Sequence, residues 1–524
     1  MPFADSASTA HEWNTSAAID LWVVVADGSE PTVSGPLGAA LQRLAARGSQ
    51  VALVVASMES LAPGTLAVET RVVVGPPAPS PRGIVEAAFA SGVEDLRKVG
   101  VVGLTRAALA AGHRAGVGAI VGVVETHDAD RRPLVPGQPD LIVTVEGLDA
   151  ALTERWGRDR AHRERILLNP GPTVVSDRVH RAIGGPDLCH REPEYRAIAE
   201  RVEELLLKVA DAPVGWRAVL LAGSGTAAME AMIGGSVRPG RRLLAIRNGT
   251  YGDRMATMAD RAGILHTDLV FGHVEPADPA AIAAALAADD SIDAISMVQH
   301  ETTTGLINPL AEVAAVARSH GVVLAVDAIS AFGSEELPLR GGGIDMVAGT
   351  ANKCLHGLPG VSFVLLSPAA LARVRAVAPH SLYLDLAGYL EAAERGSVPF
   401  TPSVPAVYGL LAALEELLDE GVAQRRATYR ERIDWLDGEL RRLGLEPAVP
   451  QAHRSASVRA VPLPPGIEYQ ALHDRLRAAG YVIYAGQGSA AAEQFRVCAL
   501  GAITVDALRP FIAELETILM AVPA

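Results

Sequence analysis

Short apolar runs alternate with alanine-rich stretches over the N-terminal part of the chain. The runs lie at residues 21–25, 51–55, 71–74, 99–102 and 119–124, and the alanine-rich stretches include 37–46 and 105–115. Short runs of β-branched residues between helical segments are typical of strands buried in a parallel sheet with helices on its faces. The pattern therefore predicts an α/β domain of the Rossmann-like type over residues 1–155.

A second and longer α/β pattern begins at residue 166, after a charged segment, residues 154–165, that is predicted to form a linker helix. Its predicted strands are 218–221, 243–246, 294–298, 322–326, 346–348 and 361–366. From about residue 410 the pattern changes to long charged helices, 411–420 and 424–443, followed by short strands near 456–461, 482–484 and 495–497. We therefore expect a large α/β domain over 156–409 and a smaller α+β domain over 410–524.

Composition narrows the possible partners. The 524 residues exceed what one hydrophobic core usually holds, which agrees with two or three domains. The net charge is -14 and no stripe of Lys and Arg occurs, so we expect no nucleic-acid partner. No apolar stretch reaches the roughly 18 residues of a membrane span, and residues 1–20 lack the basic segment and apolar run of a secretion signal, so we expect a cytoplasmic protein without a membrane partner. Cys189, Cys354 and Cys498 are far apart and in no metal-binding spacing, so neither a disulfide framework nor a metal site is expected.

A glycine-rich turn separates the predicted strand 218–221 from a predicted helix at 227–233. The turn reads Gly223-Ser224-Gly225-Thr226. Backbone N–H groups at the start of a helix bind anions, small residues allow close approach, and hydroxyl groups add donors. The turn is a candidate phosphate site. Such turns are also common as simple connections between a strand and a helix.

Two charged residues follow later strands of the same pattern. Asp327 stands at the carboxyl end of the apolar run 322–326, where open α/β sheets place ligand-binding residues. A carboxylate there can keep a pyridine nitrogen protonated, as pyridoxal 5'-phosphate (PLP) chemistry requires, or it can simply cap the next segment. Lys353 lies in a loop of small residues after the next strand, where burial would lower its pKa towards an imine-forming amine. An isolated lysine is more often an exposed surface charge. The glycine-rich turn, Asp327 and Lys353, occurring in this order, together favour a binding site.

In this order and spacing, the three features resemble the class V, fold type I, PLP-dependent aminotransferases. Supporting runs are Leu168-Asn169-Pro170-Gly171-Pro172, Asn248-Gly249-Thr250-Tyr251-Gly252-Asp253-Arg254 and His300-Glu301-Thr302-Thr303-Thr304-Gly305. The resemblance covers residue 166 to the C-terminus. Within the family it is closest to members that transfer the amino group of 2-aminoethylphosphonate to pyruvate, so these two small molecules are the expected substrates.

The resemblance implies a role for each matching residue. Ser224, Gly225 and Thr226 would hold the PLP phosphate, Tyr251 would stack on the ring, Thr302 would lie near the ring oxygen, Asp327 would pair with the pyridine nitrogen, Lys353 would carry the cofactor as a Schiff base, and Arg496 would bind the anionic group of the substrate. Family members are homodimers with shared active sites, in which Thr401 or Ser403 would reach the partner's phosphate site.

Other interpretations stay open at this point. Tyr251 could be a core residue, Thr302 a turn residue and Arg496 one half of a surface ion pair. The segment 188–192, which the resemblance places near the substrate entrance, varies among the phosphonate enzymes. Another class V activity, such as alanine–glyoxylate transamination or a lyase reaction, is therefore an alternative, as is a non-catalytic scaffold that keeps the PLP fold.

The N-terminal domain resembles the haloacid dehalogenase (HAD) phosphatases but lacks their reactive side chains. The run 23–29 has the shape of the HAD signature, with Val25 in place of the nucleophilic aspartate. Pro76 replaces a lysine and Leu104 replaces a magnesium-binding aspartate. Valine, proline and leucine supply no nucleophile, cation or metal ligand. We therefore expect a catalytically inactive HAD-like domain, the alternative being a displaced site that uses Asp27.

Overall fold

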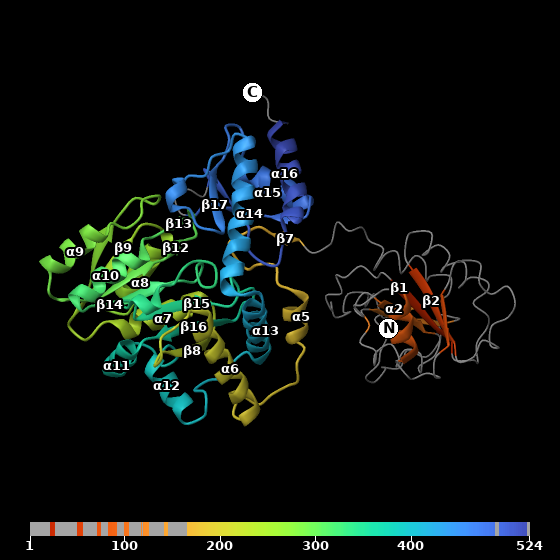
Figure 1. Ribbon diagram of the computed structural model, residues 1–524, viewed down its shortest axis with the longest axis horizontal. Coiled ribbons are helices and arrows are strands. Elements are labelled where there is room, and N and C mark those ends of the chain that lie inside the picture. The colour runs from red at the N-terminus through yellow and green to blue at the C-terminus, as the bar shows by residue number, and fades with distance from the viewer. Residues whose placement is uncertain are drawn as a thin grey trace, which may run out of the picture. The chain divides into compact units, whose positions relative to one another are not determined.

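The computed structural model describes residues 165–487 and 492–520, together with 21–26, 50–55, 71–74, 82–91, 99–103, 117, 119–124 and 141–144 of the N-terminal part. The chain divides into two compact units, Met1–Glu164 and Arg165–Ala524 (Figure 1). Within the described ranges no helix is both long and apolar enough to cross a lipid bilayer. The same residues contain no cluster of His, Cys, Asp and Glu side chains suited to a metal ion.

The N-terminal unit contains a parallel sheet with the strand order β3-β2-β1-β4-β5-β6. Its strands are β1 (Leu21–Ala26), β2 (Gln50–Val55), β3 (Arg71–Val74), β4 (Val99–Gly103), β5 (Ala119–Val124) and β6 (Leu141–Thr144). Helix α2 (Arg82–Ala90) buries Ile84 and Ala87 against these strands. All apolar runs predicted as strands are strands of this sheet. The predicted helices at 37–46 and 105–115 lie outside the described residues, as do Asp27, Pro76 and Leu104.

The large domain of the second unit is built on a sheet with the order β10-β9-β11-β14-β15-β16-β8, in which only β16 runs antiparallel to its neighbours. The strands are β8 (Arg217–Ala222), β9 (Arg242–Arg247), β10 (His266–Val270), β11 (Ile292–Val298), β14 (Val323–Asp327), β15 (Met346–Thr350) and β16 (Val361–Leu366). The sequence pattern predicted all of them except β10, an edge strand whose residues are half-buried or exposed.

Helices cover both faces of this sheet and form two separate apolar cores. Along β14, Leu324 and Val326 join one core, whereas Val323 and Ala325 join the other, because successive side chains of a strand point to opposite faces. The first core includes α6 (Pro193–Val209), α9 (Pro279–Ala288), α10 (Leu310–His320) and α13 (Val404–Glu420). The second includes α7 (Gly225–Ser236), α8 (Thr250–Arg261), α11 (Pro368–Ala376) and α12 (Leu386–Glu394). The α/β prediction for this domain is confirmed.

The small domain packs three helices on an antiparallel sheet with the order β17-β20-β19. Its elements are α14 (Val422–Arg442), β17 (Val458–Pro462), α15 (Tyr469–Ala478), β19 (Tyr484–Ala485), β20 (Gln494–Cys498) and α16 (Val505–Met520). Strand β7 (Ile166–Leu167), at the start of the unit, pairs with β18 (Tyr481–Val482) near its end. Leu168 then enters the small-domain core.

The predicted division between residues 409 and 410 falls inside α13. Leu410, Leu414 and Leu417 of this helix are buried in the large-domain core. Gly421, with φ +94, ends α13 and begins α14. We therefore place the division at Gly421, where the chain leaves the large-domain core.

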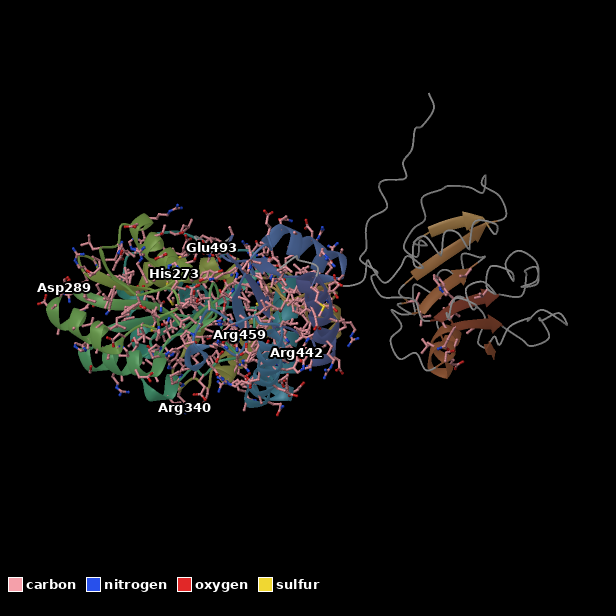
Figure 2. All side chains as sticks on the ribbon, turned by 90° about the horizontal axis from the view of Figure 1, so that it is seen from above. His273, Asp289, Arg340, Arg442, Arg459 and Glu493 are labelled. Carbon is pink, nitrogen blue, oxygen red and sulfur yellow. The ribbon has the colours of Figure 1, made fainter. Side chains whose placement is uncertain are left out.

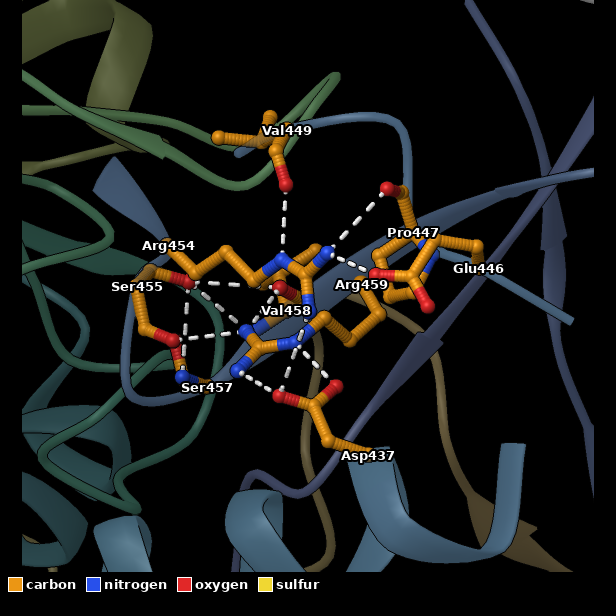
Figure 3. Close-up of polar contacts among 9 residues, drawn as sticks. All are labelled: Asp437, Glu446, Pro447, Val449, Arg454, Ser455, Ser457, Val458 and Arg459. Atoms are coloured by element: carbon orange, nitrogen blue, oxygen red, sulfur yellow. Dashed lines mark hydrogen bonds and ion pairs between the residues drawn. The ribbon is translucent and has the colours of Figure 1, made fainter. Parts of the chain in front are cut away.

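A buried ion pair holds α14 to the small-domain sheet (Figure 3). Arg459 on β17 is 3% exposed and binds Asp437 on α14 with two hydrogen bonds, at 2.7 and 2.8 Å. Nη1 of Arg459 donates to the backbone oxygens of Ser455 and Val458 at 2.6 and 2.8 Å. Four hydrogen bonds thus hold the guanidinium in the protein interior, where a buried charge needs such partners.

Removal of one partner of this pair should destabilise the unit strongly. In Asp437→Ala the Arg459 charge stays buried without its counter-ion, and we expect the free energy of unfolding to fall by about 3–5 kcal/mol. Urea denaturation followed by circular dichroism measures the change. The exposed pair between Arg340 and Asp211 is the control, because Arg340 lies at the edge of the unit (Figure 2) and Arg340→Ala should change stability little. Equal losses in the two variants would contradict this prediction.

Candidate active site

Asp327, Lys353 and the glycine-rich turn lie at one edge of the large sheet. Asp327 is the last residue of β14, and Lys353 lies on the turn after β15, the neighbouring strand. The glycine-rich turn follows β8, which runs in the same direction as β15. Open α/β sheets bind ligands at the carboxyl ends of their strands, so this edge is the candidate active site.

The glycine-rich turn presents the N-terminus of α7. Ser224 is the N-cap residue, but its side chain makes no capping hydrogen bond and is exposed. A Cβ atom on Gly225 would lie 2.6 Å from Cδ1 of Ile329, so glycine lets the helix approach the segment after Asp327 closely without displacing that side chain. Thr226 is half-buried on the first turn of the helix. The first N–H groups of α7 and the two hydroxyl groups are therefore free to bind an anion.

Asp327 is buried at the centre of this edge. Its side chain is 4% exposed, and Oδ1 accepts a hydrogen bond from the backbone N–H of Ile329 at 2.9 Å. Burial raises the pKa of Asp327 to about 7, and the negative charge of Glu301 acts in the same direction. The Ile329 hydrogen bond and the charge of Lys353 oppose that rise. Glu301 and Lys353 therefore each act electrostatically on Asp327.

Lys353 extends its amino group back across the site. Its Nζ donates a hydrogen bond to the backbone oxygen of Pro170, and burial lowers the pKa of the amine. Gly171, with φ +125, lies directly against this side chain, and a Cβ atom there would stand 2.6 Å from Cδ of Lys353. The Lys353 backbone oxygen accepts hydrogen bonds from the His356 N–H at 3.0 Å and from Oγ1 of Thr173 at 3.4 Å. Both ends of the lysine are therefore fixed.

His356 joins the Lys353 turn to the small domain. It adopts the left-handed conformation, with φ +62, which is uncommon for a residue with a side chain. Nη1 of Arg425 donates to its Nδ1 at 3.1 Å, so Nε2 carries the ring proton and donates to the Tyr429 hydroxyl. Both partners belong to α14. Burial and the Arg425 charge hold the pKa of His356 well below its usual range, so the ring is neutral. No local sequence signal marked His356 as a residue of the site.

Tyr251 and Thr302 are brought together by the short hairpin of β12 (His300–Glu301) and β13 (Leu306–Ile307). Tyr251 lies on the first turn of α8, and its backbone N–H donates to the Glu301 carboxylate at 3.0 Å. The guanidinium of Arg254 lies 4.6 Å from the centre of the Tyr251 ring. Thr302 is 1% exposed on the hairpin turn. Glu301, which sequence reasoning did not assign to the site, is therefore the link between them.

Arg496 reaches the site from the small domain. It lies on β20, is 5% exposed, and donates to the backbone oxygens of Ala485 at 2.8 Å and Thr302 at 3.2 Å. The guanidinium also lies 5.9 Å from the ring centre of Tyr484. Among the described residues no carboxylate pairs with Arg496. The surface-ion-pair interpretation is thus wrong, and the guanidinium keeps donors for an external anion.

Thr401 and Ser403 lie apart from the other predicted residues. They precede and cap α13, and both are exposed. Together with His190, Tyr383 and Phe400 they line a cavity beside β8, and the Tyr383 hydroxyl donates to the Ala222 backbone oxygen at 2.8 Å. No described hydrogen bond connects either residue to Asp327, Lys353 or Arg496 of the same chain.

The family model named aminotransferase class-V matches residues 181–503. The 2-aminoethylphosphonate–pyruvate transaminase of Syntrophobacter fumaroxidans is 37% identical over 341 residues, which cover 64% of this chain and 91% of that protein. The protein of the same name from Burkholderia thailandensis is 37% identical over 358 residues, covering 67% of this chain and 96% of that protein. The family match begins after the N-terminal unit ends.

Solved structures are similar over the same share of the chain. The pyridoxamine-pyruvate aminotransferase from Mesorhizobium loti superposes with a TM-score of 0.63 at 27% identity, over 68% of this chain and 93% of that one. An alanine–glyoxylate aminotransferase from Nostoc sp. gives a TM-score of 0.64 at 27% identity, over 68% and 95%. The fold of the second unit is therefore that of these aminotransferases.

The burial of Asp327 should make stability depend on pH. Because its pKa is about 7, the folded protein keeps a proton on this carboxyl group that the unfolded chain loses near pH 4. The resulting stabilisation is complete below the unfolded pKa and is lost as pH rises through the folded pKa. From about pH 4.5 to about pH 7.5, wild type should therefore lose about 3 kcal/mol of unfolding free energy relative to Asp327→Asn. Urea denaturation of the cofactor-free proteins tests this, and parallel pH profiles would contradict it.

Proposed function

This chain belongs to the class V aminotransferase family and is a PLP-dependent aminotransferase, and from that premise we propose that it transfers the amino group of 2-aminoethylphosphonate to pyruvate. The products are phosphonoacetaldehyde and alanine. The observation that carries the proposal is Arg496, a buried guanidinium in the site without a carboxylate partner among the described residues. The names of the two bacterial relatives support this choice of donor and acceptor.

The residues present fit PLP. The buried carboxyl group of Asp327 uses Oδ1 for the Ile329 N–H, which leaves Oδ2 to receive a protonated pyridine nitrogen. The uncapped N-terminus of α7 fits the phosphate group, with Ser224, Gly225 and Thr226 as its ligands. When bound, PLP withdraws electrons from the donor carbon through its protonated ring. Tyr251 would stack on the ring, and Thr302 would lie near the ring oxygen.

Lys353 supplies the covalent attachment and the proton transfer. Burial favours the neutral form of its amine, which is the form that attacks an aldehyde carbon. Once the amino donor has displaced Lys353 from the cofactor, Nζ would accept a proton from the carbon that carries the donor's amino group. The bonds to the Lys353 backbone oxygen keep the base of the side chain in one position while Nζ moves.

Arg496 binds the anionic group of each substrate in turn. Its bonds to Ala485 and Thr302 fix the plane of the guanidinium before any substrate arrives. The remaining donors match a phosphonate or a carboxylate equally well. One cation can therefore receive the donor's phosphonate in the first half of the reaction and the carboxylate of pyruvate in the second.

We further propose a homodimer in which Thr401 or Ser403 of each chain completes the phosphate site of the partner. Both side chains are exposed, and neither is connected to the site of its own chain. The ring centres of the adjoining Phe400 and of Tyr383 lie 4.9 Å apart, beside the end of β8. This arrangement supports a role for the segment across a subunit interface.

For the N-terminal unit we propose a HAD-like domain without catalytic activity, spanning residues 1–155 and followed by the large domain from 156. The parallel order of its strands, with β1 in the interior, is compatible with this family and with other Rossmann-like folds. The missing nucleophile, lysine and aspartate at Val25, Pro76 and Leu104 support the absence of catalysis.

A screen of single half-reactions tests the donor. The PLP-loaded protein is mixed with one amine at a time, and the change in the cofactor's visible absorbance is followed. We expect a fast change with 2-aminoethylphosphonate, and in Arg496→Gln a fall of roughly 100-fold or more in the second-order rate constant for that donor, because a charge-assisted bidentate contact is lost.

The control in the same screen is an amine without an anionic group, such as 2-aminoethanol, whose slow reaction Arg496→Gln should leave unchanged. Lys353→Ala should abolish turnover with every amine. A protein that responds to alanine but not to 2-aminoethylphosphonate would reject the proposed donor and favour an alanine–glyoxylate activity, in line with the likeness to the Nostoc enzyme.

A phosphatase assay tests the N-terminal proposal. With magnesium and a chromogenic phosphate ester, the full-length protein should show no turnover above background, because the side chains that would form the phosphate-transfer site are missing. Magnesium-dependent turnover that disappears in Asp27→Ala would instead establish a displaced active site.

A further inference from the structure

Glu301 is a buried carboxylate that the proposed reaction leaves without a role. It ends β12, has 0% exposure, and lies within the hairpin between Tyr251 and Thr302. A carboxylate is seldom buried so completely unless donors surround it. Its hydrogen bonds therefore indicate what the residue does.

Three donors point at this carboxylate. Oε2 accepts from the backbone N–H of Tyr251 at 3.0 Å, and Oε1 accepts from the backbone N–H of Thr303 at 3.1 Å and from its hydroxyl at 2.6 Å. Burial raises the pKa of Glu301, and these hydrogen bonds oppose that rise. One side chain thus joins the start of α8 to the turn after β12.

The position of Glu301 replaces a missing helix cap. The N-cap residue of α8 is Gly249, which has no side chain to bind the first N–H groups of the helix. A Cβ atom on Gly249 would lie 2.5 Å from Oε2 of Glu301, so the carboxylate occupies the space of a capping side chain. Negative charge at this end of a helix is also favoured by the helix dipole.

Each end of the link holds a residue of the candidate site. On one side, the capped turn of α8 carries the Tyr251 ring, which Arg254 contacts at 4.6 Å. On the other, Thr302 accepts a hydrogen bond from Arg496 through its backbone oxygen. A substitution at Glu301 should therefore alter the position of the Tyr251 ring and of the Arg496 guanidinium together.

We infer that Glu301 is a positioning residue that caps α8 from across the site and thereby holds Tyr251 against the cofactor and the Thr302 turn against Arg496. The inference rests on the proposed function only in that Tyr251 contacts PLP. The identity of the amino donor does not enter it.

The test is Glu301→Gln, which keeps the size of the side chain but turns one oxygen into an NH₂ group facing a donor. We expect PLP to bind roughly 10- to 100-fold more weakly, as for the loss of a buried charge-assisted hydrogen bond. We also expect a changed visible circular dichroism band of the bound cofactor, which reports the orientation of its ring. Both measurements use PLP alone, without an amino donor.

The matched control is Glu335→Gln. Glu335 is also a buried carboxylate, at 6% exposure, and its Oε1 accepts a backbone N–H, that of Ala456, at 2.7 Å. Burial raises its pKa as it does for Glu301. This variant should lose stability while its PLP affinity and its dichroism band stay those of wild type.

If Glu301→Gln does not fold, Thr303→Val serves instead, since it removes the hydroxyl bond to the carboxylate and leaves the Tyr251 bond. It should shift PLP affinity and the dichroism band in the same direction by a smaller factor. Variants at Glu301 and Thr303 that lose stability as Glu335→Gln does, but keep wild-type PLP affinity and dichroism, would overturn the inference. Wild-type protein that does not bind PLP would overturn the proposed function and the inference together, whereas failure of 2-aminoethylphosphonate to react would leave these measurements valid.

Discussion

The site depends on the burial of two ionisable groups of opposite sign, Asp327 and Lys353, at the ends of neighbouring strands. Water is the best solvent for both charges, so their removal from it favours the neutral forms, raising one pKa and lowering the other. A carboxyl group whose pKa is raised and an amine whose pKa is lowered suit an enzyme that moves protons on carbon. The packing around them keeps both side chains buried.

That packing is achieved by small residues and by contacts between the two domains of the catalytic unit. Gly171 and Gly225 let backbone segments lie where any Cβ atom would collide with Lys353 or Ile329. The small domain contributes Arg496 to the site and fixes the Lys353 turn from behind through the contacts of α14 with His356. The hairpin and the small domain meet directly, since Leu306 pairs with Arg454, and Figure 1 shows β13 next to β17. Contacts between the large and the small domain therefore hold both the hairpin side and the Arg496 side of the site in place.

Much of this fold could be predicted from local sequence. A buried strand has a short apolar run as its signal, and an anion-binding turn has glycine and serine residues just before a helix. The central strands and the placement of Ser224, Asp327 and Lys353 follow from such local signals. Strand β10 was not predicted, because an edge strand is only partly buried and so lacks a continuous apolar run. The roles of Glu301 and His356 could not be foreseen, since each depends on partners some 50 to 70 residues away that only the folded chain brings close. The boundary between the large and the small domain is hard to predict from sequence, because a long helix such as α13 can belong to either neighbour until its buried face is known.

The pairing of β7 with β18 has a consequence for how the protein is made. Strand β7 is among the first parts of the catalytic unit to leave the ribosome, yet its partner lies roughly 300 residues later in the chain. Loop closure over such a distance is slow relative to local helix formation, and domains generally fold in the order of their synthesis. The opening segment must therefore wait, with Leu168 exposed, until nearly all of the unit has been translated. During that interval the nascent chain offers an unpaired strand, although the N-terminal unit and most of the large domain have already been translated.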